Sequence, residues 1–246
     1  MKSNIVYYIY APRWRDNAAG IRVLHYLCHE INLSGNYAYL IIQNPSKKYE
    51  EINKDLKTPI LDIKQEKLHR ENKFKQIVIY SETVPGNPIN GKYIIRYLLN
   101  YPGALGGPKF FPQNELIVSY TENIAKSVKS SKFTLFIPAV RSGELKIRSK
   151  KVRNLNLVYA GKYRAFIGTP IFNYGEKVKE IYRDGPLKQE RSEVLNLLAS
   201  ADKIYCWENS TIATEAILLN TICVFIPNPF LGEIIASKEL GPWGYC

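Results

Sequence analysis

The sequence predicts an α/β protein made of two parallel sheets with crossover helices. Short apolar runs rich in β-branched and aromatic residues alternate with segments of helical periodicity. This alternation restarts after a Lys/Arg-rich segment, residues 146–153. Strands that alternate with helices form parallel sheets, because each crossover helix returns the chain to the start of the next strand. We therefore expect two units, residues 1–145 and 152–246, of which the second is small for a complete α/β domain.

The first unit is expected to begin with a strand at residues 5–10. A helix is expected over residues 18–33, where apolar residues recur close to helical spacing at Ile21, Leu24, Leu27, Cys28 and Ile31. Further strands are expected over residues 37–42, 76–80, 115–120 and 134–138, and further helices over residues 92–99 and 122–128.

The second unit repeats the pattern with strands over residues 155–160, 203–207 and 222–226. Helices are expected over residues 175–182, 188–201 and 210–219, and the second of these has the apolar face Val194, Leu195, Leu197 and Leu198. Both units therefore have the strand and helix order of Rossmann-like domains.

The charge of the chain fits an anionic partner. With 34 Lys and Arg residues against 22 Asp and Glu, the net charge is +12, which suits nucleic acid, an anionic membrane surface or phosphorylated small molecules. A lysine-rich surface without any such partner fits equally well. The 18 tyrosines are scattered through the strands rather than grouped with basic residues, and no nucleic-acid motif is found. Nucleic acid is therefore not an expected partner.

The cysteines and histidines show no metal-binding pattern. Cys206 and Cys223 lie in apolar runs, where a free thiol packs as a small hydrophobic group. His25 and His29 are one helical turn apart without an evident third ligand, so packing roles are expected and no metal site is predicted. The N-terminal apolar stretch is short and is interrupted by Pro12, unlike a signal peptide or membrane span. We expect a cytoplasmic protein, either soluble or in peripheral contact with the anionic inner face of a membrane.

The strongest candidate for a binding site is the segment of residues 205–230. Its first strand ends at Trp207, Glu208 lies in the turn, and Ser210 or Thr211 caps the next helix. Ligands of parallel sheets bind beyond the carboxyl ends of the strands. A helix that starts there offers backbone N–H groups and a positive dipole end to a phosphate. An ordinary capped helix without a ligand is the alternative interpretation.

Two further features extend this candidate site. Glu215 lies about one turn into the helix, where its carboxylate can accept hydrogen bonds from ribose hydroxyls; a solvated glutamate is the alternative. In the separate segment of residues 159–168, a strand runs into Gly161, followed by Lys162 and Arg164. Glycine allows close approach of the backbone, and the two cations can neutralise a diphosphate. A solvated loop is the alternative for this segment.

The first unit offers two carboxylates at strand ends. Glu82 directly follows a strand within residues 81–107, where Pro and Gly residues are concentrated. It can deprotonate a hydroxyl group or accept hydrogen bonds from loop amides. Asp16 lies in the loop after the first strand and is a second candidate base. Arg96 is expected to form an internal ion pair.

Taken together, these segments resemble the GT-B glycosyltransferases, most closely those of bacterial capsule and O-antigen synthesis. The resemblance rests on residues 205–230, on the strand–Gly–Lys/Arg opening of the second unit and on the string from Glu82 to Gly107. It implies two Rossmann-like domains facing a cleft, with the donor on the second. Many relatives have a glycine where this chain has Asn220, and Asn also tolerates the left-handed conformation at a helix end.

The resemblance implies transfer of a sugar from a nucleotide-sugar donor to a glycan or lipid-linked saccharide acceptor in surface polysaccharide biosynthesis. Catalysis would use Glu82 or Asp16 as the base, no metal and no cofactor other than the donor substrate. The donor would contact Gly161, Lys162, Arg164, Glu208, Ser210, Thr211 and Glu215. The alternatives are a non-catalytic or scaffold component of a polysaccharide assembly complex and a GT-B-like sugar-nucleotide epimerase.

Overall fold

The computed structural model describes residues 4–45, 50–141, 155–170, 178–182, 184–239 and 241. The chain divides into two compact units, Met1–Ala139 and Val140–Cys246. Each holds one sheet in which all paired strands are parallel, which confirms the predicted α/β class. The segment of residues 146–153, in which the boundary was predicted, lies outside the described residues. No helix in the described ranges is long and apolar enough to cross a membrane.

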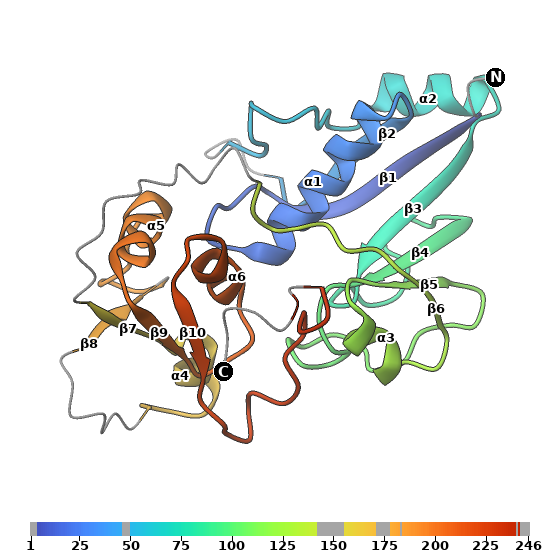
Figure 1. Ribbon diagram of the computed structural model, residues 1–246. Helices are drawn as coiled ribbons and strands as arrows, with labels where there is room; N and C mark the ends of the chain where they lie inside the picture. Colours follow the sequence, from blue (N-terminus) through green and yellow to red (C-terminus); the bar gives the residue numbers. More distant parts are fainter. Residues whose placement is uncertain are drawn as a thin grey trace. The chain divides into compact units, whose positions relative to one another are not determined.

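In its described residues, unit 1 forms a six-stranded sheet with the order β2-β1-β3-β4-β5-β6 (Figure 1). The strands are β1 (Ile5–Pro12), β2 (Tyr37–Gln43), β3 (Lys75–Ser81), β4 (Tyr93–Leu98), β5 (Leu116–Ser119) and β6 (Ser131–Thr134). The helices are α1 (Ala19–Leu33), α2 (Ile63–Glu71) and α3 (Glu122–Ser127).

The two faces of this sheet are packed differently. On one face, Ile9 of β1 and Leu40 of β2 pack with Leu24 of α1 in a buried apolar cluster. On the other face, Tyr8 donates or accepts a hydrogen bond of 2.9 Å with His69 of α2. Because Tyr8 and Ile9 are neighbours in one strand, they point to opposite faces. The helices α1 and α2 therefore cover opposite faces, as in a doubly wound fold.

Unit 2 has a smaller sheet, with the order β10-β9-β7-β8 among the described residues. Its strands are β7 (Asn156–Tyr159), β8 (Val178–Ile181), β9 (Lys203–Cys206) and β10 (Ile222–Phe225). Its helices are α4 (Gly161–Phe166), α5 (Arg191–Ser200) and α6 (Thr211–Leu218).

This sheet is also packed on both faces. Leu198 of α5 and Ala216 of α6 pack with Leu157 of β7 in one buried cluster. On the opposite face, the ring of Tyr163 from α4 lies 5.0 Å from that of Trp207. The strand order thus repeats that of the first four strands of unit 1, whereas α6 between β9 and β10 has no counterpart between β3 and β4. In both units the connections that leave the first and third strands run in opposite directions across the sheet, so the switch point lies between these two strands.

Two local predictions for unit 2 are confirmed. Cys206 and Cys223 are buried and free, with their Sγ atoms 3.5 Å apart in the apolar core. Asn220 has a φ of 57°, the left-handed conformation expected of it after α6. The N–H of Thr221 donates to the carbonyl of Ala216 at 2.8 Å and closes this helix end.

Several predicted elements were wrong. Residues 92–99 were expected to be helical but contain β4, whose apolar run is rich in Ile and Tyr and is buried between β3 and β5. The helix over residues 175–182 is contradicted by the edge strand β8, while residues 175–177 lie outside the described residues. The strand expected over residues 134–138 is replaced by β6, an exposed edge strand without an apolar pattern.

Two helices, α2 and α4, were not predicted from the sequence. The helix α2 is strongly polar, and His69 is the one buried residue within it, so it shows no apolar stripe. The helix α4 is only 6 residues long and has no buried residue. Neither helix carries the periodic signal on which the other assignments relied.

A buried ion pair fixes the loop that follows β3. Arg96 of β4, with its side chain 1% exposed, donates to both carboxylate oxygens of Glu115 at 2.8 and 2.9 Å. It also donates to the carbonyls of Val84 at 2.7 Å and Gly86 at 2.9 Å. The internal ion pair predicted for Arg96 is confirmed. Because one guanidinium joins β4 to this loop, we expect it to be essential for the fold of unit 1.

Arg96→Met should lower the free energy of unfolding by about 3–5 kcal/mol, because it leaves the Glu115 carboxylate buried without its cation. Denaturant titration measures this loss. Lys54→Met is the matched control, since the Lys54–Glu50 pair is 79% and 72% exposed and should contribute less than about 1 kcal/mol. Equal effects of the two substitutions would contradict a structural role for Arg96.

Candidate functional site

The candidate site of unit 2 lies at the topological switch point of its sheet, where the connections from two neighbouring strands run in opposite directions. The strand β7 pairs with β8 on one side and with β9 on the other. In an open parallel sheet, such a switch point leaves a crevice outside the carboxyl ends of the two diverging strands. The last residues of β7 and β9, Tyr159 and Cys206, lie opposite each other in the register. The two segments singled out in the sequence, which follow these strands, therefore meet at one edge.

Hydrogen bonds join the two segments directly. The Nζ atom of Lys162 donates to the carbonyl oxygen of Asn209 at 2.9 Å. The backbone N–H of Tyr163 donates to Oε2 of Glu208 at 2.8 Å. The second carboxylate oxygen of Glu208 lies 3.7 Å from the Lys162 ammonium. Hydrogen bonds thus join the first turn of α4 to the loop between β9 and α6.

Glu208 holds α4 against the loop between β9 and α6, and it does not face solvent. Its side chain is fully buried, and its carboxylate accepts the N–H of the third residue of α4. A carboxylate of the chain itself therefore occupies the amino end of α4. We assign Glu208 the role of orienting Lys162, whose side chain is 35% exposed and can reach a ligand.

The amino end of α6 is capped by a neutral hydroxyl. Ser210 has an extended backbone, and its Oγ accepts the N–H of Ile212 at 3.4 Å. This distance is long for an N–H···O hydrogen bond, so the interaction is weak. Ser210 and Thr211 are both partly exposed. A phosphate oxygen can replace such a cap, because the helix dipole and the amides of the first turn favour an anion.

Arg164 is directed toward β8. Its Nη2 donates to both oxygens of Glu180 at 2.6 and 2.9 Å, and Tyr182 donates its hydroxyl to the same carboxylate at 2.7 Å. The side chains of the pair are 34% and 15% exposed. A diphosphate would therefore contact Arg164 only in competition with Glu180.

Glu215 is also bonded internally. Its side chain is fully buried in α6 and forms an ion pair with Arg191, the first residue of α5. The solvated glutamate considered from the sequence is thereby wrong. Arg191 was not among the predicted site residues, because its only signal in the sequence is a basic residue near the start of a predicted helix. A ribose would meet Glu215 together with Arg191, as a pair.

Gly161 and Asn209 shape the loops of the site. A Cβ atom on Gly161 would lie 2.9 Å from the hydroxyl of Tyr159, so the glycine makes room for a side chain of β7. Asn209 donates to the carbonyls of Leu231 at 2.7 Å and Glu233 at 2.8 Å. It thereby fastens the segment after β10 to the switch point. This role of Asn209 was not foreseen, because an Asn in a turn usually bonds within its own loop.

The two carboxylates of unit 1 follow neighbouring parallel strands, β1 and β3, which flank the switch point of this sheet. Asp16 is exposed and accepts a hydrogen bond from Nε1 of Trp14 at 2.5 Å. Glu82 is 3% exposed and accepts the backbone N–H of Leu99 at 2.9 Å. Of the two roles considered for Glu82, the structure shows bonding to loop amides.

Burial changes the acidity of Glu82. Removal from water raises the pKa of its carboxyl to about 7, although hydrogen bonds from backbone amides and the charge of Arg96 act in the opposite direction. The Glu82 carboxyl therefore keeps its proton to a higher pH than an exposed glutamate does.

The histidines have structural roles. His25 is fully buried, and its Nε2 lies 3.0 Å from the carbonyl of Pro12. The Nδ1 of His29 accepts the N–H of Lys57 at 2.8 Å. Within the described ranges, no group of three or more His, Cys, Asp or Glu side chains is arranged to hold a metal ion.

Neither a protein-family model nor a curated protein matches this chain. Function is therefore inferred from the topology and the contacts of the two switch points.

The pKa of Glu82 predicts how stability depends on pH. Its pKa in the folded chain, about 7, exceeds the ordinary value of 4.5, so the folded state binds more protons between these values. Stability should be greatest below pH 4.5 for this group and should fall as the pH rises through 7. Relative to Glu82→Gln, which stays neutral, the wild type should lose roughly 3 kcal/mol between pH 4.5 and 7.5. Denaturant titrations of both proteins at pH 5 and 8 test this, and parallel losses would contradict it.

Proposed function

We propose that the chain is a glycosyltransferase of the GT-B type, which moves a sugar from a nucleotide-sugar donor to a glycan or lipid-linked saccharide in bacterial surface polysaccharide synthesis. One observation carries the proposal. Two segments about 40 residues apart, selected from the sequence as donor-binding, are hydrogen-bonded to each other through Lys162 and Asn209 at the switch point of a parallel sheet.

In this proposal the donor diphosphate lies against the amino end of α6. Backbone N–H groups and the hydroxyls of Ser210 and Thr211 donate to its oxygens, and Lys162 supplies a positive charge. As the bond between the sugar and the phosphate breaks, negative charge grows on the phosphate oxygen. Donors that are already fixed in place stabilise that charge without reorganisation. The Glu215–Arg191 pair would flank the ribose.

The acceptor hydroxyl must lose a proton as it attacks the sugar. A base has to reach that proton, which favours the exposed Asp16 over the buried Glu82. Glu82 would support the site indirectly by holding the backbone at Leu99. The proposed location is cytoplasmic, with peripheral membrane contact when the acceptor is lipid-linked.

Thermal unfolding with UDP, GDP, CMP and dTDP nucleotides tests donor binding. One base class should raise Tm by about 5 °C or more at a hundredfold excess over Kd, because a ligand that binds only the folded state stabilises it. No shift with any nucleotide would contradict the transferase and favour a non-catalytic role in an assembly complex. Turnover of the sugar nucleotide without an acceptor would favour an epimerase.

Lys162→Ala should weaken binding of the active nucleotide about tenfold or more, since it removes a charged hydrogen bond to phosphate. Lys188→Ala is the matched control: its side chain is 40% exposed against 35% for Lys162, and its pair with Glu190 lies in the segment before α5. Isothermal titration measures both affinities. Equal affinities in the two variants would show that the diphosphate does not lie at Lys162.

A further inference from the structure

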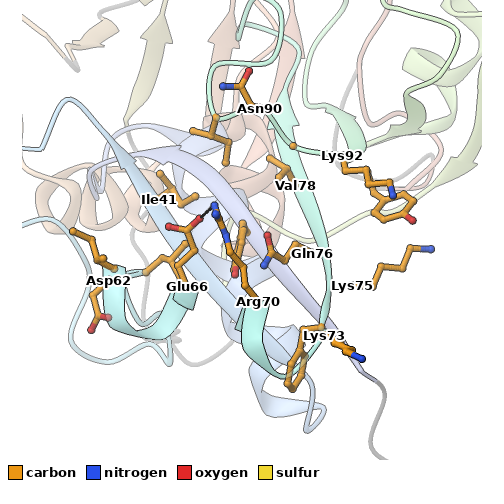
Figure 2. Close-up of a pocket in the computed structure, with 17 residues that line it drawn as sticks. Ile41, Asp62, Glu66, Arg70, Lys73, Lys75, Gln76, Val78, Asn90 and Lys92 are labelled. Carbon is orange, nitrogen blue, oxygen red and sulfur yellow. Dashed lines mark hydrogen bonds and ion pairs between the residues drawn. The ribbon is translucent and has the colours of Figure 1, made fainter. Parts of the chain in front are cut away.

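Unit 1 has a pocket of about 800 Å³ beside α2, at the amino-end half of its sheet (Figure 2). Its lining includes Gln76 near the start of β3 and Lys92 just before β4. Asp16 and Glu82 lie instead beyond the carboxyl ends of β1 and β3. The pocket is therefore separate from the switch point of this sheet, and its volume is that of a small-ligand site.

The pocket exists because one crossover lacks a helix. The steps from β2 to β3 and from β3 to β4 move in the same direction across the sheet, so right-handed crossovers place both on the face that carries α2. Residues 82–92 connect β3 to β4 without any helix. The sheet face next to α2 is therefore left partly open.

A rigid loop forms the wall opposite α2. The side chain of Asn87 accepts the N–H of Gly91 at 2.8 Å and donates to its carbonyl at 3.0 Å. A Cβ atom on Gly91 would lie 2.5 Å from Cγ2 of Val78, so only glycine lets the loop rest directly on the sheet. Tyr80 donates its hydroxyl to Asn87 at 2.7 Å and locks the turn. The pocket is thus preformed.

The lining of the pocket combines apolar and polar residues. Ile41 and Ile89, which are both partly exposed, supply apolar surface. Figure 2 shows Arg70 of α2 between Glu66 of the same helix and Gln76 of β3. Glu66 and Arg70 are paired at 2.5 Å, with side chains 35% and 68% exposed.

The polar residues of the lining offer both hydrogen-bond donors and acceptors. The Gln76 side chain is partly buried and forms no hydrogen bond with another described residue, so its amide can donate twice and also accept. Arg70 only donates, and the Glu66 carboxylate only accepts. Lys75 and Lys92 place their Nζ atoms 4.3 and 5.5 Å from the centre of the Tyr93 ring, and Figure 2 shows them turned away from Glu66.

Charge and polarity together favour one class of ligand. Glu66 and Arg70 neutralise each other beside Gln76. The lysines of the lining, Lys73, Lys75 and Lys92, lie away from Glu66 in Figure 2, so an uncharged polar ligand fits beside Gln76. A hydrocarbon would bury the Gln76 amide without a partner. A sugar has hydroxyls that both donate and accept, and a face of C–H groups that packs on apolar side chains. We infer that the pocket binds a neutral saccharide, with its C–H face on Ile41 and Ile89 and its hydroxyls bonded to Gln76, Arg70 and Glu66. The inference concerns unit 1 alone and does not rest on the proposed donor site.

Saturation-transfer NMR on the full chain tests this inference with methyl glucoside, methyl galactoside, methyl N-acetylglucosaminide and methyl glucuronide. At least one neutral glycoside should receive saturation at its ring protons. Gln76→Leu should weaken its binding by about fivefold or more, since the amide hydrogen bonds are lost. Gln113→Leu, an exposed glutamine outside the pocket lining, is the matched control and should bind as the wild type does.

Arg70→Met is a second variant for the same binding measurement. It should fold as the wild type does, because removal of an exposed ion pair costs little stability. Thermal unfolding identifies any variant that fails to fold. Absence of transfer to every neutral glycoside, binding of the glucuronide alone, or equal binding by Gln76→Leu and Gln113→Leu would each overturn the saccharide site. The nucleotide-induced shift that depends on Lys162 should persist in Gln76→Leu, so the two proposals can fail separately.

Discussion

A buried carboxylate organises the candidate site on which the functional proposal depends. Glu208 has no solvent exposure, yet it lies at the edge of the sheet where two loops must be held together. A buried charge of this kind persists only when it is hydrogen-bonded and paired. Glu208 meets that condition by accepting the amide of Tyr163 from α4 and by lying close to the ammonium of Lys162. The same contacts that satisfy the carboxylate therefore direct Lys162 toward the start of α6.

The cations of unit 2 that were selected from the sequence are matched by carboxylates of the chain. Lys162 lies near Glu208, and Arg164 is bonded to Glu180. The net charge of +12 is therefore not concentrated at this edge. A diphosphate would be held mainly by backbone amides at α6 and by the exposed part of Lys162. Such donors are fixed before the ligand arrives, which is the arrangement that stabilises charge during bond cleavage.

The sequence was sufficient for the fold class and for most strands, because alternating apolar segments predict parallel sheets whichever residues pair. It also predicted that Lys162 and Ser210 follow buried strands, at the edge where parallel sheets bind ligands. The sequence did not predict the features that depend on contacts between distant segments. The segment around Arg96 was expected to be a helix, although its apolar run is a buried strand. The partners of Glu208 and Glu215 lie 45 and 24 residues away in sequence, and no local pattern predicts such contacts.

The most direct test of the donor site is the ¹H–¹⁵N spectrum of the chain as the nucleotide that raises Tm is added. The proposal predicts that the largest shifts appear at the amides of Lys162, Thr211 and Ile212, where α4 and α6 begin. Largest shifts in unit 1, or unchanged amides at the start of α6 while the nucleotide is bound, would contradict a phosphate site at this switch point.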